Sequence, residues 1–165
     1  MAPHSIRLAC MVSAALLVGA CVPDPLKEVA VSDLEAYWVV DTPVGETNRI
    51  APAVRFKVTS KGAKKFIEAQ ASFHRKSQAQ GEWGNAFAPV TQAGKPMATG
   101  EGRVVTLVME EGHYTGSVPP EDLLHNPAFS DVHVLVFIRV GSSSWVKMAE
   151  VDAERRIGTH ALEGR

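Results

Sequence analysis

Cysteine is almost absent from this sequence. Of 165 residues, only Cys10 and Cys21 carry a thiol, and both lie in the first 21 positions. The chain beyond them therefore has neither a disulfide nor a thiol nucleophile. A chain of this length buries enough apolar surface to fold without a covalent cross-link. The absence excludes cysteine-based catalysis and a disulfide-stapled scaffold from the main part of the protein.

An excess of charge of either sign is also lacking. Seventeen basic and eighteen acidic side chains leave a formal net charge of −1. Nucleic-acid binding depends on a basic surface that neutralises phosphates, and this sequence has no basic run and no acidic tail. We therefore expect no nucleic-acid partner.

Metal-binding motifs are missing as well. The histidines beyond the first 21 residues show neither a HExxH motif nor any other short-range ligand spacing. His74 and His133 could lie on adjacent strands, although solvated histidines are the simpler interpretation. We expect no metal and no other cofactor. The remaining histidines are His113, His125 and His160.

Common catalytic arrangements are absent too. Ser142–Ser144 follow Gly141 in a short turn and do not form the G-x-S-x-G elbow of serine hydrolases. Glu110 and Glu111 are neighbours on an expected strand, so their carboxylates should point to opposite faces and not into one cleft. The sequence predicts no catalytic residues, and we expect a protein that is not an enzyme.

The sequence contains one long hydrophobic run. Leu8 to Ala20 is an uncharged stretch behind His4 and Arg7. It is shorter than the ~20 residues that a membrane-spanning helix needs, but it has the length of a secretory signal. Small residues, Gly19 and Ala20, stand directly before Cys21.

Residues 1–22 thus resemble the lipobox signal of a bacterial lipoprotein. The resemblance implies that Cys21 is lipidated and becomes the first residue after a signal helix, residues 1–20, is removed. Val22, where some lipoproteins carry aspartate, favours the outer membrane and a location facing the periplasm. Val18 and Ala20 also satisfy conventional signal cleavage. The alternative is therefore a secreted, soluble domain with an unmodified Cys21.

Beyond the signal, strand patterns dominate. Residues 53–59 and 66–76 alternate between apolar and polar, which is typical of half-buried antiparallel strands. Residues 132–140 are largely apolar on both faces in the middle of the segment, and the turn at Gly141–Ser144 joins them to a partner strand at 145–151. We predict an all-β, antiparallel β-sandwich of about seven strands. It resembles the immunoglobulin-like class in length and strand number but lacks its Cys–Trp–Cys framework.

The domain boundaries follow from these patterns. Residues 21–28 are expected to be a lipidated tether, in which Pro23 and Pro25 disfavour a helix and keep residues 22–25 extended. The β-sandwich is expected at 29–158, with Ile157 docking on it, and residues 159–165 as a flexible tail.

Aromatic residues provide the candidate binding sites. Trp83 lies in a glycine-rich segment, Trp145 follows the Gly141–Ser144 turn, and either Tyr37 or Trp38 should face outward on a strand. The sequence therefore predicts a non-enzymatic binding or scaffolding module, tied to the membrane through lipid on Cys21, with an envelope protein as partner. A periplasmic small-ligand carrier is the alternative, with its pocket between the sheets or beneath residues 101–124.

Overall fold

Two antiparallel sheets build the protein. The computed structural model describes residues 22–44, 47–64, 66–77 and 81–158. One sheet has the strand order β1-β2-β5, with β6 also paired to β2, and the other has the order β4-β3-β7-β8. The strands are β1 (Val29–Val44), β2 (Thr47–Ser60), β3 (Ile67–Arg75), β4 (Gly84–Pro89), β5 (Gly102–Val108), β6 (Tyr114–Gly116), β7 (Val132–Val140) and β8 (Val146–Asp152).

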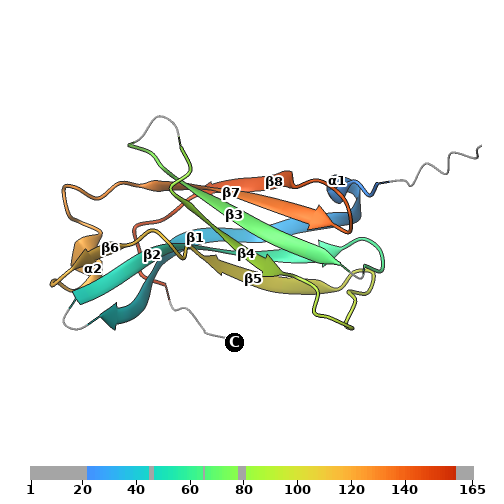
Figure 1. The fold of residues 1–165 in the computed structure, drawn as a ribbon, viewed down its shortest axis with the longest axis horizontal. Coiled ribbons are helices and arrows are strands. Elements are labelled where there is room, and N and C mark those ends of the chain that lie inside the picture. The colour runs from blue at the N-terminus through green and yellow to red at the C-terminus, as the bar shows by residue number, and fades with distance from the viewer. Residues whose placement is uncertain (1–21, 45–46, 65, 78–80, 159–165) are drawn as a thin grey trace, which may run out of the picture.

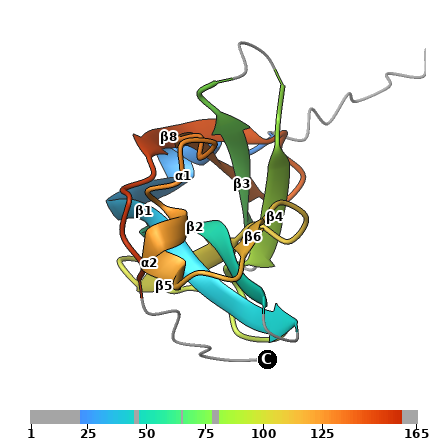
Figure 2. The same ribbon diagram turned by 90° about the vertical axis from the view of Figure 1, so that its left-hand side faces the viewer.

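This architecture confirms the predicted all-β sandwich. Placing β1, β2 and β5 in one sheet and β3, β7 and β8 in the other reproduces how strands A, B, E and C, F, G divide in immunoglobulin-like sandwiches. The described residues form eight strands, one more than about seven, because the three-residue β6 is too short to produce a sequence pattern. Figure 2 shows the two sheets as separate layers.

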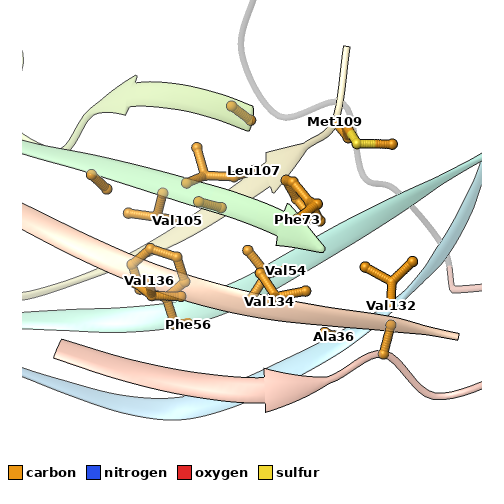
Figure 3. Close-up of a cluster of buried hydrophobic side chains, with 14 of the residues drawn as sticks. Ala36, Val54, Phe56, Phe73, Val105, Leu107, Met109, Val132, Val134 and Val136 are labelled. Carbon is orange, nitrogen blue, oxygen red and sulfur yellow. The ribbon is translucent and has the colours of Figure 1, made fainter. Parts of the chain in front are cut away.

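The core fills the space between the sheets. β7 alternates buried and half-buried residues along its whole length, and Val132, Val134 and Val136 are fully buried. Phe73 of β3 lies in the same sheet as these valines, and Phe56 of β2 packs against them from the other sheet (Figure 3). Burial of these side chains, at about 1.5–3 kcal/mol each, is the main force that holds the layers together.

Short helices mark the two ends of the sandwich. Helix α1 (Pro25–Glu28) begins at Asp24, whose side chain accepts a hydrogen bond of 3.1 Å from the Leu26 amide. The expectation that Pro25 disfavours a helix is wrong, because proline is tolerated in the first turn of a helix. Helix α2 (Pro120–Leu123) lies with β6 at the opposite end (Figure 1).

The C-terminal part of the described chain covers the edge of β1. The Trp38 amide donates to the Arg156 carbonyl at 3.0 Å, and the Gly158 amide donates to the Trp38 carbonyl at 2.7 Å. Ile157 packs against the core, as the sequence suggested. The tail at 159–165 and Cys21 lie outside the described residues. No helix in the described part is long and apolar enough to cross a bilayer.

Candidate binding surface

The outer face of the β4-β3-β7-β8 sheet carries an aromatic hollow. We define the aromatic hollow by the residues that line it, namely Glu68, Ala69, Phe87, Ala88, Pro89, Arg139 and Trp145, and its volume is ≈ 390 Å³. Strand pairing brings these residues together from distant parts of the sequence. Glu68 of β3 stands opposite both Pro89 of β4 and Arg139 of β7.

Two aromatic rings flank the aromatic hollow. Phe87 is 58% exposed although it is a large apolar residue, and its ring meets that of Trp145 edge-on at a centroid distance of 6.0 Å. The Arg139 guanidinium lies over the Trp145 ring, 4.9 Å from its centroid. Stacking of this kind fixes the orientation of an aromatic side chain without burying it.

An ion pair supports the aromatic hollow. Arg139 donates to Glu68 through Nε at 2.8 Å and makes a second, close contact through Nη2. The two charges neutralise each other, so the site offers an apolar contact area and not a free charge. Arginine is suited to this place because its planar head can bind a carboxylate and stack on a ring at once.

The turn after β7 positions Trp145. Gly141 has a φ of +57°, a conformation that glycine adopts without strain. Ser143 is buried, and its hydroxyl accepts a hydrogen bond of 3.0 Å from the Val140 amide while donating to the Ser144 carbonyl at 3.1 Å. The serine run therefore organises a turn, in agreement with the interpretation of residues 142–144 as turn chemistry.

Trp83 lies at the other end of the sandwich, in a cluster of aromatic rings. It is half-buried, with its centroid 6.3 Å from that of Trp38 and 5.5 Å from that of Tyr114. Arg75 covers it at 4.1 Å. These contacts give Trp83 a packing role, and a binding role for it stays a prediction.

Tyr37 is covered. It points away from Trp38, as neighbours on a strand do, but it is only 4% exposed. The Arg156 guanidinium lies 4.7 Å from its ring centroid, and Gly158 packs against the ring so closely that a Cβ there would overlap it. Burial raises the pKa of the Tyr37 hydroxyl. The expected exposure of this residue is wrong because residues 154–158 lie across it.

A polar network occupies the same sheet face, farther from α1. The Ser72 hydroxyl donates to Glu82 at 2.7 Å and lies 2.8 Å from Nε2 of His74. Because a hydroxyl has one proton, His74 must be the donor in the second bond. In a hydrolase triad the histidine stands between serine and acid, whereas here the serine stands between them. His74 therefore cannot accept the proton of Ser72 in this arrangement.

His133 stands directly across from His74, as the sequence allowed. Its Nδ1 lies 2.8 Å from Asp152, whose other oxygen accepts from Lys76 at 2.6 Å. Lys76 and then His133 hold the pKa of the Asp152 carboxyl below its ordinary value. Within the described residues, no group of three or more histidine, cysteine or acidic side chains is arranged to hold a metal.

A second hollow is lined by polar and charged residues. It measures ≈ 510 Å³ and is lined by Thr47, Arg49, Glu111, His113 and Thr115. Its central cation is already compensated, since Arg49 lies 3.2 Å from Asp41, and His113 lies 3.1 Å from the same carboxylate. The aromatic hollow is the stronger candidate because apolar aromatic contacts contribute most to protein interfaces.

Sequence reasoning identified one residue of the aromatic hollow, Trp145, and missed Phe87, Glu68 and Arg139 as site residues. The strand alternation predicts that Glu68 faces outward, but only the register of β3 with its two neighbours places it beside the other two.

No protein-family model matches this sequence, and no curated protein matches it. Among solved structures, the chain is similar to a crystal structure from Bordetella pertussis that is named provisionally as the ApaA protein. The two share 13% identity with a TM-score of 0.34, over 76% of this chain and 93% of the other.

Proposed function

We propose that this protein is a lipid-anchored, non-enzymatic binding module of the bacterial envelope. In this proposal, lipid on Cys21 holds it at the outer membrane, facing the periplasm. The rigid sandwich then presents the aromatic hollow to another envelope protein.

The observation that carries the proposal is the exposure of Phe87 beside Trp145 on an open sheet face. An aromatic side chain that is 58% exposed keeps apolar surface in contact with water, which is unfavourable unless a partner covers it. Exposed apolar patches rimmed by polar groups mark interaction sites. Glu68 and Arg139 supply such a rim and leave no charge unpaired.

The partner that fits is a protein with an apolar or aromatic side chain to place in the aromatic hollow. A volume of ≈ 390 Å³ accommodates one such side chain and its neighbours. Two rigid rings give a large contact area with little loss of side-chain entropy, which favours a protein interface.

Affinity capture from envelope membranes tests the proposal. Phe87→Ala and Trp145→Ala should each lower recovery of a specific partner about tenfold or more, because truncation of a central aromatic typically costs at least ~2 kcal/mol. Val104→Ala is the matched control, since Val104 is 56% exposed on β5 of the other sheet. Equal recovery of every captured protein with all three variants and the unmodified chain would refute the aromatic hollow as a contact surface.

A small-ligand carrier is the second candidate function, and the size of the aromatic hollow favours it. Ligand pockets commonly span about 300–1,000 Å³, so the aromatic hollow lies at the lower end of this range. It lies on the outer sheet face, not between the sheets or beneath residues 101–124, where the buried side chains of Leu123 and Leu124 join the core. Thermal stabilisation by an apolar small molecule that Trp145→Ala abolishes would favour the carrier, whereas partner capture without such stabilisation would favour the binding module.

A further inference from the structure

The end of the sandwich that carries α1 combines exposed apolar side chains with exposed lysines. We call this the anchor end and define it as residues 22–28, 60–64, 66, 90–102 and 141–145, which lie together on the right of Figure 1. Its exposed apolar residues are Val22, Leu26 and Phe66, at 63%, 55% and 47% exposure.

Hydrogen bonds connect these segments into one surface. The Lys61 ammonium donates to the Leu26 carbonyl at 3.0 Å, and the Lys61 amide donates to the Glu28 carbonyl at 2.9 Å. The Gly141 amide donates to the Phe66 carbonyl at 3.0 Å. The exposed Leu26 and Phe66 therefore belong to one continuous end of the molecule.

The charge of the anchor end is positive once internal pairs are taken out. Each of its carboxylates is engaged: Asp24 caps α1, Glu28 pairs with Lys64, and Glu101 pairs with Arg103. Within the described residues, neither Lys61 nor Lys95 has a carboxylate partner. Lys27 lies 3.8 Å from the Asp24 carboxylate, and its side chain is 84% exposed.

The opposite end has the opposite balance. Its described residues at 41–49, 75–84, 109–132 and 152–158 include nine carboxylates and five arginines or lysines. The protein is therefore polarised along its long axis, with the cationic end at α1 and the acidic end at α2 (Figure 1).

We propose that the anchor end lies against the surface of an anionic phospholipid bilayer, with its lysines among the headgroups and Leu26 and Phe66 at the interface. The inference rests on the proposed lipidation of Cys21. Only Val22–Asp24 separate that residue from α1, so an extended connection spans about 10 Å. This is close to the ~8 Å over which surface charge acts at physiological ionic strength. Basic residues this close to an anionic leaflet are attracted to it.

Lysine footprinting on vesicles tests the inference. The purified full-length lipoprotein is reconstituted in vesicles of phosphatidylcholine alone, or of phosphatidylcholine with phosphatidylglycerol, and treated with an amine-acylating reagent. Lys27, Lys61 and Lys95 should be modified several-fold more slowly on the anionic vesicles, and ~1 M salt should remove this protection by screening. Lys76, at the opposite end, is the internal control and should react equally on both.

Charge-reversal variants sharpen the test. Lys61→Glu with Lys95→Glu should abolish the protection of Lys27, whereas Lys76→Glu should leave it intact. Equal modification of Lys27, Lys61 and Lys95 on the two vesicle types would overturn the inference.

The lipid anchor on Cys21 can be tested separately from the membrane contact of the anchor end. Protein that does not float with phosphatidylcholine vesicles would contradict the lipid anchor. Flotation of that same protein with phosphatidylglycerol vesicles alone would still support the anchor-end surface, and its absence would refute it.

Discussion

At the scale of single residues, the aromatic side chains divide between structure and surface. Trp38, Trp83 and Tyr114 form a cluster in which Tyr114 also accepts a hydrogen bond of 2.9 Å from the Ser130 amide. Phe87 and Trp145 instead meet on an exposed sheet face. Composition does not distinguish the two groups, because both contain tryptophan beside glycine or polar residues. Trp38 is fully buried and Phe87 is 58% exposed, whereas Trp83, Tyr114 and Trp145 are all half-buried. The two groups are therefore distinguished by the rings that each residue contacts.

Asp131 should make the free energy of unfolding fall at acidic pH. It accepts hydrogen bonds from Arg155 at 2.7 and 3.1 Å, and this bonding lowers the pKa of its carboxyl from 3.8. A lowered folded-state pKa stabilises the fold above the unfolded value, and the contribution is lost as pH falls through the folded-state pKa. Asp131→Asn should therefore lower the free energy of unfolding by less than about 1 kcal/mol at neutral pH, since the pair is partly exposed.

Urea unfolding at neutral pH and well below pH 3.8 measures this effect. The difference between Asp131→Asn and the unmodified protein should shrink in acid, because protonation removes the same interaction from the latter. The exposed Glu110→Gln serves as the matched control for loss of one carboxylate. A difference for Asp131→Asn that is equal at both pH values would contradict the assigned role of the ion pair.

At the scale of elements, a bulge in β1 changes which of its residues face the core. The pairing with β2 shifts by one residue between Ser32 and Glu35, and Asp33 has a φ of +51°. Val29 and Val31 pack on the core before the bulge, whereas Ala36 and Trp38 do so after it. The inward positions thus change from odd to even, which lets one long strand cover the whole core.

Substitutions at Asp33 test this account of β1. Asp33→Val should lower the free energy of unfolding by about 1–2 kcal/mol, because a β-branched residue is strained at positive φ. Asp33→Gly is the matched comparison and should be neutral or stabilising, since glycine adopts this conformation freely. Chemical denaturation measures both. Equal destabilisation by the two substitutions would mean that the backbone conformation is not the cause.

The same bulge explains what the sequence predicts well and what it does not. β7 alternates over its whole length and β2 does so over residues 54–60, so the sequence pattern identifies the inward face of these segments. In β1 the bulge breaks the alternation, and β6 is too short to have one. Trp145 was found because it follows a clear turn. Phe87 and Arg139 depend on the register of three strands, which no local pattern encodes.

At the scale of the whole molecule, its two ends differ in charge and one face carries the aromatic hollow. The cationic anchor end holds the residues that follow Cys21, and the acidic end is remote from them (Figure 1). Trp145 follows the turn beside Pro23, so the aromatic hollow opens near the anchor end. We therefore expect the proposed partner to be reached close to the membrane, not at the acidic tip.

Lipid attachment at Cys21 is the central claim, and metabolic labelling with palmitate in a bacterial host tests it most directly. The unmodified protein and Cys10→Ser should both incorporate label and fractionate with membranes, since Cys10 lies in the segment expected to be removed. Cys21→Ser should lose the label and accumulate unprocessed. A Cys21→Ser protein that is processed and located like the unmodified one would contradict the account and favour a secreted, soluble domain.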